Sequence, residues 1–444
     1  MKNNVLSKQQ KTVGLDFILM SLLMFVTDSP LFIYTTNPLL SSFRKWFVIL
    51  VPCFLLARLM FQNIKFSKMH ILVVLILSAN LLLTAAVTEG ESFNVYVLYG
   101  FKILTAALIT VQWSFERFVQ SFIRVMRVIA ICSLIIYIFV QIDSGFAELL
   151  PIVEIYESNG NGTMKMGTAV FSNVYLNVSS SWTMRNFGAF WEPGAYAAYL
   201  NLALFFILFH IEKNKIRVID IVLFAASLVT TVSLGGIIAG GILILMWIFN
   251  IKKTKGGLAF FVILVFVAAA LYISSNEDIM EMFTHRLQED NGSFDSRWYS
   301  IFGNLRAFAE RPLVGVGLQT VDERIGEYYA YIGRNIHNTN TLLLYFSSLG
   351  IIAGSTFTYM WWKVATKSTE NIFYQLAMFV YFFIMLANED FTGSYTFMLV
   401  PLYVMTLKDE HKSKEVIADA EDSVDKQLPL AYNKQGFRLP NRSK

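Results

Sequence analysis

The sequence predicts an all-α, polytopic integral membrane protein with about 12 transmembrane helices. Of its 444 residues, 55% are hydrophobic and only 15% are charged, whereas soluble domains carry about 25% charged residues. The hydrophobic residues gather in runs of roughly 16 to 22, close to the length that a helix needs to cross a bilayer. This composition excludes an ordinary soluble enzyme and a disordered chain.

The predicted spans are helices rather than strands, because in lipid the backbone groups of each segment must bond within that segment. They cover residues 15–34, 46–61, 69–87, 95–113, 125–142, 190–210, 218–232, 235–249, 257–273, 340–362, 372–387 and 395–407. Cytoplasmic connections are rich in lysine and arginine. With the N-terminus inside, the inside connections hold 17 basic residues and the short outside ones only Arg44 and Lys45. Both termini are therefore predicted to be cytoplasmic.

Two outside loops are long, residues 143–189 and 274–339, and both contain aromatic and apolar residues at helical spacing. In the second loop, one helical face carries Trp298, Ile301, Phe302, Leu305 and Phe308. We expect this stretch to lie on the membrane surface or against the bundle, and to end where Arg311-Pro312 and two glycines follow. The membrane-embedded domain is predicted to span residues 1–407, and the polar tail 408–444 to be a disordered cytoplasmic segment.

Several common chemistries have no signature in this chain. There is no glycine-rich phosphate loop, which argues against an ATPase. Cys53 and Cys132 lie inside apolar runs, and no cysteine cluster or outer pair of aspartates suggests a metal. No basic run suggests a nucleic-acid partner. We therefore expect no metal and no cofactor.

The second outer loop carries six arginines and no lysine. They are Arg286, Arg297, Arg306, Arg311, Arg324 and Arg334. The planar guanidinium matches phosphate with two hydrogen bonds and stays charged. Pairing with loop carboxylates or lipid head groups would explain any single one of them. Taken together, they favour at least one site for an anionic substrate at the outer membrane face.

Two helix starts at that face carry further candidates. Pro193 suits the first turn of a helix, and Glu192 suits its cap, where negative charge is favoured. This helix start gives no reason for an arginine at position 185, shortly before it. His337 is followed by Asn338, Thr339 and Asn340. Asparagine and threonine often cap the N-termini of helices. A helix N-terminus favours the neutral imidazole that a general base needs. The structural alternatives are a head-group contact for Arg185 and a capping hydrogen bond for His337.

These residues carry a resemblance to a known family. The stretch from Arg297-Trp298 through Pro312-Leu313-Val314-Gly315-Val316-Gly317 to His337-Asn338-Thr339-Asn340, followed by Leu349-Gly350, resembles the signature of the O-antigen polymerase and O-antigen ligase superfamily. The block from Arg185 to Trp191-Glu192-Pro193-Gly194 resembles an earlier segment of bacterial, Wzy-type polysaccharide polymerases. Ligases often carry His-Pro where this chain has Glu192-Pro193, which favours a polymerase.

The resemblance implies a metal-independent, inverting glycosyltransferase of the bacterial inner membrane, acting in lipopolysaccharide or related polysaccharide biosynthesis. A polymerase transfers a glycan from undecaprenyl diphosphate onto a lipid-linked repeat unit, whereas a ligase transfers it to lipid A-core. Arg185 and Arg297 resemble the arginines that hold the donor diphosphate, and His337 the histidine that deprotonates the acceptor. Arg306, Arg311, Arg334 and Glu192 are further candidates for substrate binding.

The implied partners are the lipid-linked glycan donor, the glycan acceptor and membrane lipid, together with a flippase and a chain-length regulator. An alternative from another class is a transporter or flippase for lipid-linked oligosaccharide. A transporter would be expected to bury charged residues along a central path, and the predicted spans contain few of them.

Overall fold

The computed structural model describes residues 2–62, 68–156, 162–169, 171–176, 185–210, 217–250, 292–330 and 338–404. They all belong to one compact unit of the chain, Met1–Thr406. The predicted span 257–273, the predicted tail 408–444, Arg334 and His337 lie outside the described residues.

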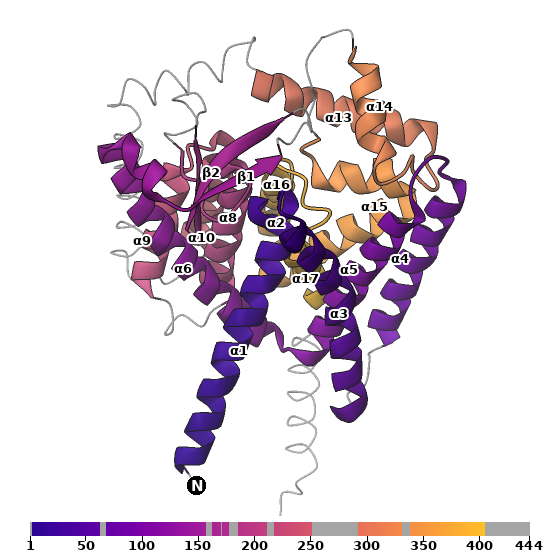
Figure 1. Cartoon of the computed structure of the whole chain (residues 1–444). Coiled ribbons are helices and arrows are strands. Elements are labelled where there is room, and N and C mark those ends of the chain that lie inside the picture. Colours follow the sequence, from indigo (N-terminus) through magenta and orange to yellow (C-terminus); the bar gives the residue numbers. More distant parts are fainter. Residues whose placement is uncertain are drawn as a thin grey trace, which may run out of the picture. The chain divides into compact units, whose positions relative to one another are not determined.

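The first third of the chain is a series of helices (Figure 1). They are α1 Lys2–Asp28, α2 Pro30–Ile33, α3 Pro38–Gln62, α4 Lys68–Val87, α5 Phe93–Gln112 and α6 Phe115–Ile142, followed by the short 3-10 helix η1 Ser144–Leu149. Helix α6 begins ten residues before the predicted span at 125, because Ser114 caps it by accepting a hydrogen bond from the Arg117 N–H at 3.2 Å. Arg117 therefore belongs to a helix rather than to a connection.

The chain after the first outer loop supplies the remaining helices. They are α8 Pro193–Phe209, α9 Val218–Thr230, α10 Leu234–Asn250, α13 Gly292–Glu310, α14 Thr320–Tyr328, α15 Thr341–Ser368, α16 Ile372–Leu386 and α17 Tyr395–Val404. Within the described residues, five helices are long and apolar enough to cross a membrane, and five shorter ones are also apolar. The protein is thus mostly helical, in agreement with the predicted class, while the count of 12 spans stays a prediction.

One small sheet departs from the all-α prediction. In the first outer loop, β1 Ile152–Tyr156, β2 Thr163–Ala169 and β3 Ser172–Leu176 form an antiparallel sheet in the order β1-β2-β3. Ile155, Met166 and Tyr175, one from each strand, are buried in a cluster with Phe187. The helical spacing expected for this loop is therefore wrong: its β-branched and aromatic residues pack across paired strands.

Helix α8 lies at the centre of the core. Every residue from Pro193 to Leu208 is buried, and the helix contacts α6, α9, α10 and α16. A helix that is apolar on all sides is stable only when neighbours cover every face. The N-terminus of α8, where Glu192 and Pro193 stand, is thereby held at a fixed position.

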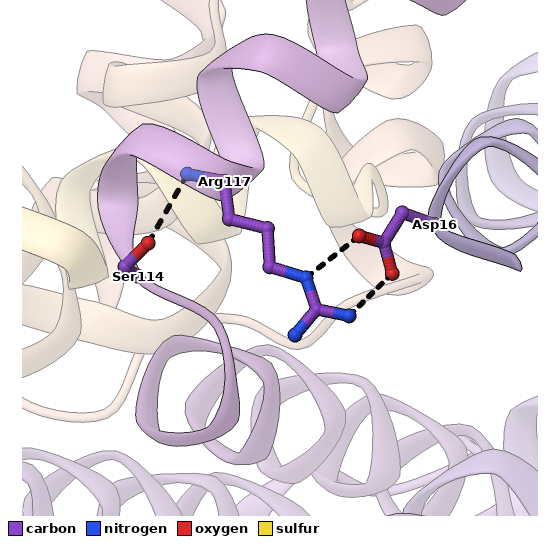
Figure 2. Close-up of polar contacts among 3 residues, drawn as sticks. All are labelled: Asp16, Ser114 and Arg117. Carbon is purple, nitrogen blue, oxygen red and sulfur yellow. Dashed lines mark hydrogen bonds and ion pairs between the residues drawn. The ribbon is translucent and has the colours of Figure 1, made fainter. Parts of the chain in front are cut away.

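Two buried ion pairs connect α6 to its neighbours. The Arg117 guanidinium donates to both carboxylate oxygens of Asp16 on α1, at 2.7 and 2.5 Å (Figure 2). Arg127 makes the same two-pronged contact with Asp220 on α9, at 2.7 Å for each bond. Both carboxylates are almost fully buried, so each pair satisfies charges that would otherwise be costly in the bundle.

Candidate functional site at the start of helix α8

Glu192 is the N-cap of α8, and Pro193 occupies the first helical turn, as the sequence predicts. The backbone of Glu192 is extended, with φ −143° and ψ 154°, and its side chain makes no capping hydrogen bond. An N-cap carboxylate usually accepts a bond from the first turn of its own helix.

Glu389, in the connection between α16 and α17, is a buried acidic residue beside this helix start. Only 6% of Glu389 is exposed, and Glu192 and Trp191 are among the groups that act on its pKa. Burial, together with the nearby Glu192 carboxyl, holds the pKa of Glu389 well above its usual range. The sequence showed Glu389 only as part of an acidic outside connection, so this residue was missed as a site candidate.

Gly194 makes room for the Glu389 carboxyl. A Cβ atom at Gly194 would lie 2.5 Å from Glu389 Oε1, which is closer than real Cβ atoms come to other heavy atoms. The glycine of the Glu192-Pro193-Gly194 block is therefore required for a close approach between two distant segments. This requirement is the signal that sequence reasoning could have used, since a glycine in the first turn of a buried helix often marks such an approach.

The positive charge of Arg297, on α13, opposes the rise in the pKa of Glu389. Its Nε atom is buried and has no hydrogen-bond partner among the described residues. A buried guanidinium N–H without a partner is costly unless a ligand satisfies it. Two predicted site residues, Arg297 and Glu192, are thus both among the groups that act on the pKa of Glu389.

The residues that follow His337 are bound to α13, one turn from Arg297. The Asn338 side-chain oxygen accepts hydrogen bonds from Ser300 Oγ at 2.9 Å and from Asn304 Nδ2 at 2.8 Å. The Thr339 N–H donates to Ser300 Oγ at 3.1 Å. This polar face of α13 is buried, and it fixes the segment that begins α15 against the helix that carries Arg297. Asn340 caps α15 by accepting from the Leu343 N–H at 3.0 Å, confirming the predicted helix start.

The glycine-containing segment 312–317, which follows α13, packs against a break in α15. Helix α15 is interrupted at Gly350, where φ is 81° and ψ is −174°. The carbonyl groups released by this break accept bonds from the segment after α13: Val316 N–H donates to Ser347 at 2.8 Å and Gly317 N–H to Ser348 at 3.1 Å. In return, the Ile351 N–H donates to Pro312 at 2.8 Å.

The two backbones meet too closely for side chains at the crossing points. A Cβ at Gly315 would lie 2.3 Å from the Ser348 carbonyl, and one at Gly350 would lie 2.3 Å from the Leu313 carbonyl. Both glycines also have positive φ. Gly315 and Gly350 therefore serve the close packing of these two backbone segments.

Glu91, between α4 and α5, fixes the start of α14. Its carboxylate accepts backbone N–H bonds from Leu318 at 3.2 Å, Gln319 at 2.7 Å and Thr320 at 2.6 Å. Burial acts against the charged form, but the bonds from Thr320, Tyr96 and Gln319 outweigh it and lower the pKa of Glu91. Negative charge at a helix N-terminus is favourable, so α14 is anchored to the α4–α5 connection.

The apolar face predicted for α13 is exposed rather than buried. Trp298, Phe302 and Leu305 are 53%, 45% and 45% exposed, whereas Ser300, Asn304 and Ala307 are buried against α15 and α14. A helix that exposes its apolar face and buries polar, hydrogen-bonded residues fits the lipid interface. Of the two predicted positions, membrane surface or bundle, the exposed face favours the membrane surface.

The other predicted arginines have different surroundings. Arg185 Nε donates to the Thr231 carbonyl at 3.1 Å, and the residue lines a pocket with parts of α6 and β3. The Arg306 guanidinium lies 4.1 Å from the centre of the Tyr328 ring, and Arg311 donates to the Val87 carbonyl at 3.2 Å. The contacts shown for these three residues are separate from Glu192 and Glu389, and their roles in binding stay predictions.

Among the described residues, no group of three or more His, Cys, Asp or Glu side chains is arranged to hold a metal ion. Residues 219–358 match the family model described as O-Antigen ligase. This stretch of the chain is therefore similar to the O-antigen ligase family. No curated protein and no solved structure matches the chain.

The matched region runs from α9 into α15, about a third of the chain. This region includes Arg297, His337 and the glycines Gly315 and Gly350. Arg185, Glu192 and Glu389 lie outside it. Members of this family are bacterial membrane proteins that act as glycosyltransferase-like O-antigen ligases and polymerases, with lipid-linked glycans as substrates.

Proposed function

We propose that the protein is a bacterial polysaccharide polymerase that transfers a glycan from undecaprenyl diphosphate onto the next lipid-linked repeat unit. The acceptor hydroxyl oxygen would attack the anomeric carbon of the donor sugar. The bond between that carbon and the diphosphate oxygen would break, the hydroxyl proton would pass to His337, and the electron pair would leave with the diphosphate. Attack from the face opposite to the leaving group inverts the configuration.

The buried, unpartnered Nε of Arg297 is the observation that carries this proposal. A diphosphate oxygen would satisfy that N–H, and the guanidinium would stabilise the charge that develops on the leaving group. The hydrogen bonds from α13 to Asn338 and Thr339 support the arrangement, because they hold the residue after His337 one turn from Arg297. The exposed apolar face of α13 would let a donor with a polyprenyl tail approach from the lipid.

A ligase that transfers the polymer to lipid A-core is the second candidate, and the description of the matching family model favours it. Glu192 favours the polymerase, since ligases often carry histidine at this place. We propose in either case that the protein lies in the bacterial inner membrane with both termini in the cytoplasm, and works with a flippase and a chain-length regulator.

Deletion of the gene, followed by gel analysis of surface polysaccharide, separates the two candidates. Loss of the ladder with one repeat unit still on its anchor indicates a polymerase. A bare anchor, with long polymer accumulating on the carrier lipid, indicates a ligase. Complementation with His337→Ala should leave the deletion pattern unchanged at normal protein level. A wild-type ladder from that variant would remove His337 as the base.

A further inference from the structure

A polar pocket lies between α6, β3 and the segment at residues 185 and 186. With its mouth it measures about 230 Å³, less than the roughly 300 Å³ at which pockets begin to enclose whole drug-sized ligands. Strand β3 belongs to the first outer loop, and α6 ends beside it at Ile142. The pocket is therefore at the face predicted to be outside, and its size matches one sugar residue or one substituent of a sugar.

The Asn173 amide is the group that points to a ligand. Only 4% of Asn173 is exposed. Its side-chain oxygen accepts a hydrogen bond from Thr168 Oγ1 at 2.9 Å, and its backbone N–H donates to the Gly188 carbonyl at 2.7 Å. The Nδ2 atom is also buried, yet it has no hydrogen-bond partner among the described residues. A buried donor without an acceptor is destabilising, so this amide offers an N–H to an acceptor that enters the pocket.

The segment that brings Arg185 to the pocket is fixed from two sides. Arg185 Nε donates to the Thr231 carbonyl at 3.1 Å. The next residue, Asn186, is buried, and its Nδ2 donates to Thr230 Oγ1 at 3.0 Å and to Ser133 Oγ at 3.3 Å. These contacts reach α6 and the end of α9, so the guanidinium is held in place by the protein itself. Donors that are positioned by supporting hydrogen bonds are typical of binding sites.

The lining of the pocket selects for an acceptor with one negative charge. It contains one cation, Arg185, and no acidic residue. The remaining polar residues are serine, tyrosine and asparagine, and three aliphatic residues, Ile136, Val140 and Val174, complete it. A phosphate group carries about two negative charges near neutral pH, and no second cation lines the pocket to balance them. A carboxylate carries one charge and only accepts hydrogen bonds.

We propose that this pocket binds the carboxylate of an acidic sugar, such as a uronic acid residue, in the glycan substrate. One carboxylate oxygen accepts from Asn173 Nδ2, the negative charge faces Arg185, and the aliphatic side chains pack against C–H groups of the sugar ring. This inference rests on the proposed function, in which the substrate is a glycan. It assigns Arg185 to the sugar, whereas the family resemblance implies the donor diphosphate.

Asn173→Asp is the sharpest variant, because it replaces the free N–H by a negative charge and keeps the shape. The new carboxylate retains an oxygen for Thr168 Oγ1, and the backbone bond to Gly188 is unaffected. Asn371→Asp is the matched control: it adds the same charge at the exposed N-cap of α16, where an aspartate also accepts from the Phe373 N–H.

Saturation-transfer NMR on the purified full-length protein in nanodiscs measures the binding of four probes. They are glucuronate and galacturonate, with glucose and galactose as their uncharged counterparts. At least one uronate should bind roughly tenfold or more tightly than its counterpart, to the wild type and to Asn371→Asp alike. Asn173→Asp should weaken that binding by roughly tenfold or more, because a hydrogen bond to a charged group is lost. Arg185→Gln, which removes the cation, should weaken it as well.

Equal binding of the uronates and the uncharged sugars, or no binding of either uronate, would overturn the carboxylate as the ligand. Unchanged uronate binding by both Asn173→Asp and Arg185→Gln would overturn the pocket as its site. Displacement of the uronate by an equal concentration of inorganic diphosphate would overturn the proposal in favour of a phosphate site. The assay requires no transfer reaction, so its result is distinct from a failure of the proposed polymerase activity.

Discussion

Gly350→Ala should separate α13 from α15 and disorder the site. The φ of 81° and ψ of −174° at Gly350 lie in a region that is essentially restricted to glycine, and another residue there costs about 1–3 kcal/mol. The added Cβ would also lie 2.3 Å from the Leu313 carbonyl and 2.6 Å from the Val314 nitrogen. Both atoms belong to the backbone, so no side chain can move aside.

Relief of that overlap requires the 312–317 segment to withdraw from the break in α15. The bonds from Val316 N–H, Gly317 N–H and Ile351 N–H would then be lost, each worth about 1 kcal/mol. With the backbone strain, the total is about 4–6 kcal/mol. Thermal unfolding of the purified protein in nanodiscs should show an apparent Tm lower by about 5–10 °C, together with loss of the polysaccharide ladder.

Gly241→Ala in α10 is the control, because a Cβ there meets nothing within 4 Å and alanine favours a helix by about 1 kcal/mol over glycine. Its apparent Tm should equal or exceed that of the wild type. If Gly350→Ala and Gly241→Ala had the same Tm and the same ladder, the close approach of the two backbones would not be needed for the fold, and the reasoning would be refuted.

Three further predictions concern the elements around the site. Arg297→Lys should lose most transfer at normal protein level, because the charge remains but the planar fork does not; a normal ladder would exclude a bidentate role. Glu91→Gln should speed hydrogen exchange at the Leu318, Gln319 and Thr320 amides by about tenfold. The pKa of Glu91 is lowered in the folded protein, so the stabilisation that Glu91 gives to the start of α14 is complete above about pH 4.3 and is lost as the pH falls below that. Acid should therefore produce the same increase in hydrogen exchange in the wild type. Equal exchange in the wild type and Glu91→Gln at neutral pH would contradict the anchoring role of Glu91. Lipids brominated near the head group should quench the fluorescence of Trp298, measured as the difference between the wild type and Trp298→Phe. An unquenched signal would place the exposed face of α13 away from the membrane.

Local pattern was sufficient for the helices and for their ends near the site. The predicted start of α15 at Asn340 and the end of α13 at Glu310 are confirmed, because capping and glycine-proline signals act over a few residues. The apolar runs within the described residues coincide with helices, since a chain in lipid has to satisfy its backbone within each segment. The exception is the sheet in the first outer loop, whose pairing joins strands across turns and depends on the cluster around Phe187.

The sequence by itself predicted a mostly helical membrane protein, a resemblance to the O-antigen ligase family and the candidate residues Arg297 and Glu192. Only the tertiary structure placed the buried Glu389 carboxyl against Gly194, nearly 200 residues away in the sequence. It also showed that the signature glycines Gly315 and Gly350 serve backbone packing. The physical reason is range: helix formation and capping depend on neighbouring residues, whereas the close approach of Glu389 to Gly194 depends on how segments far apart in the chain pack together.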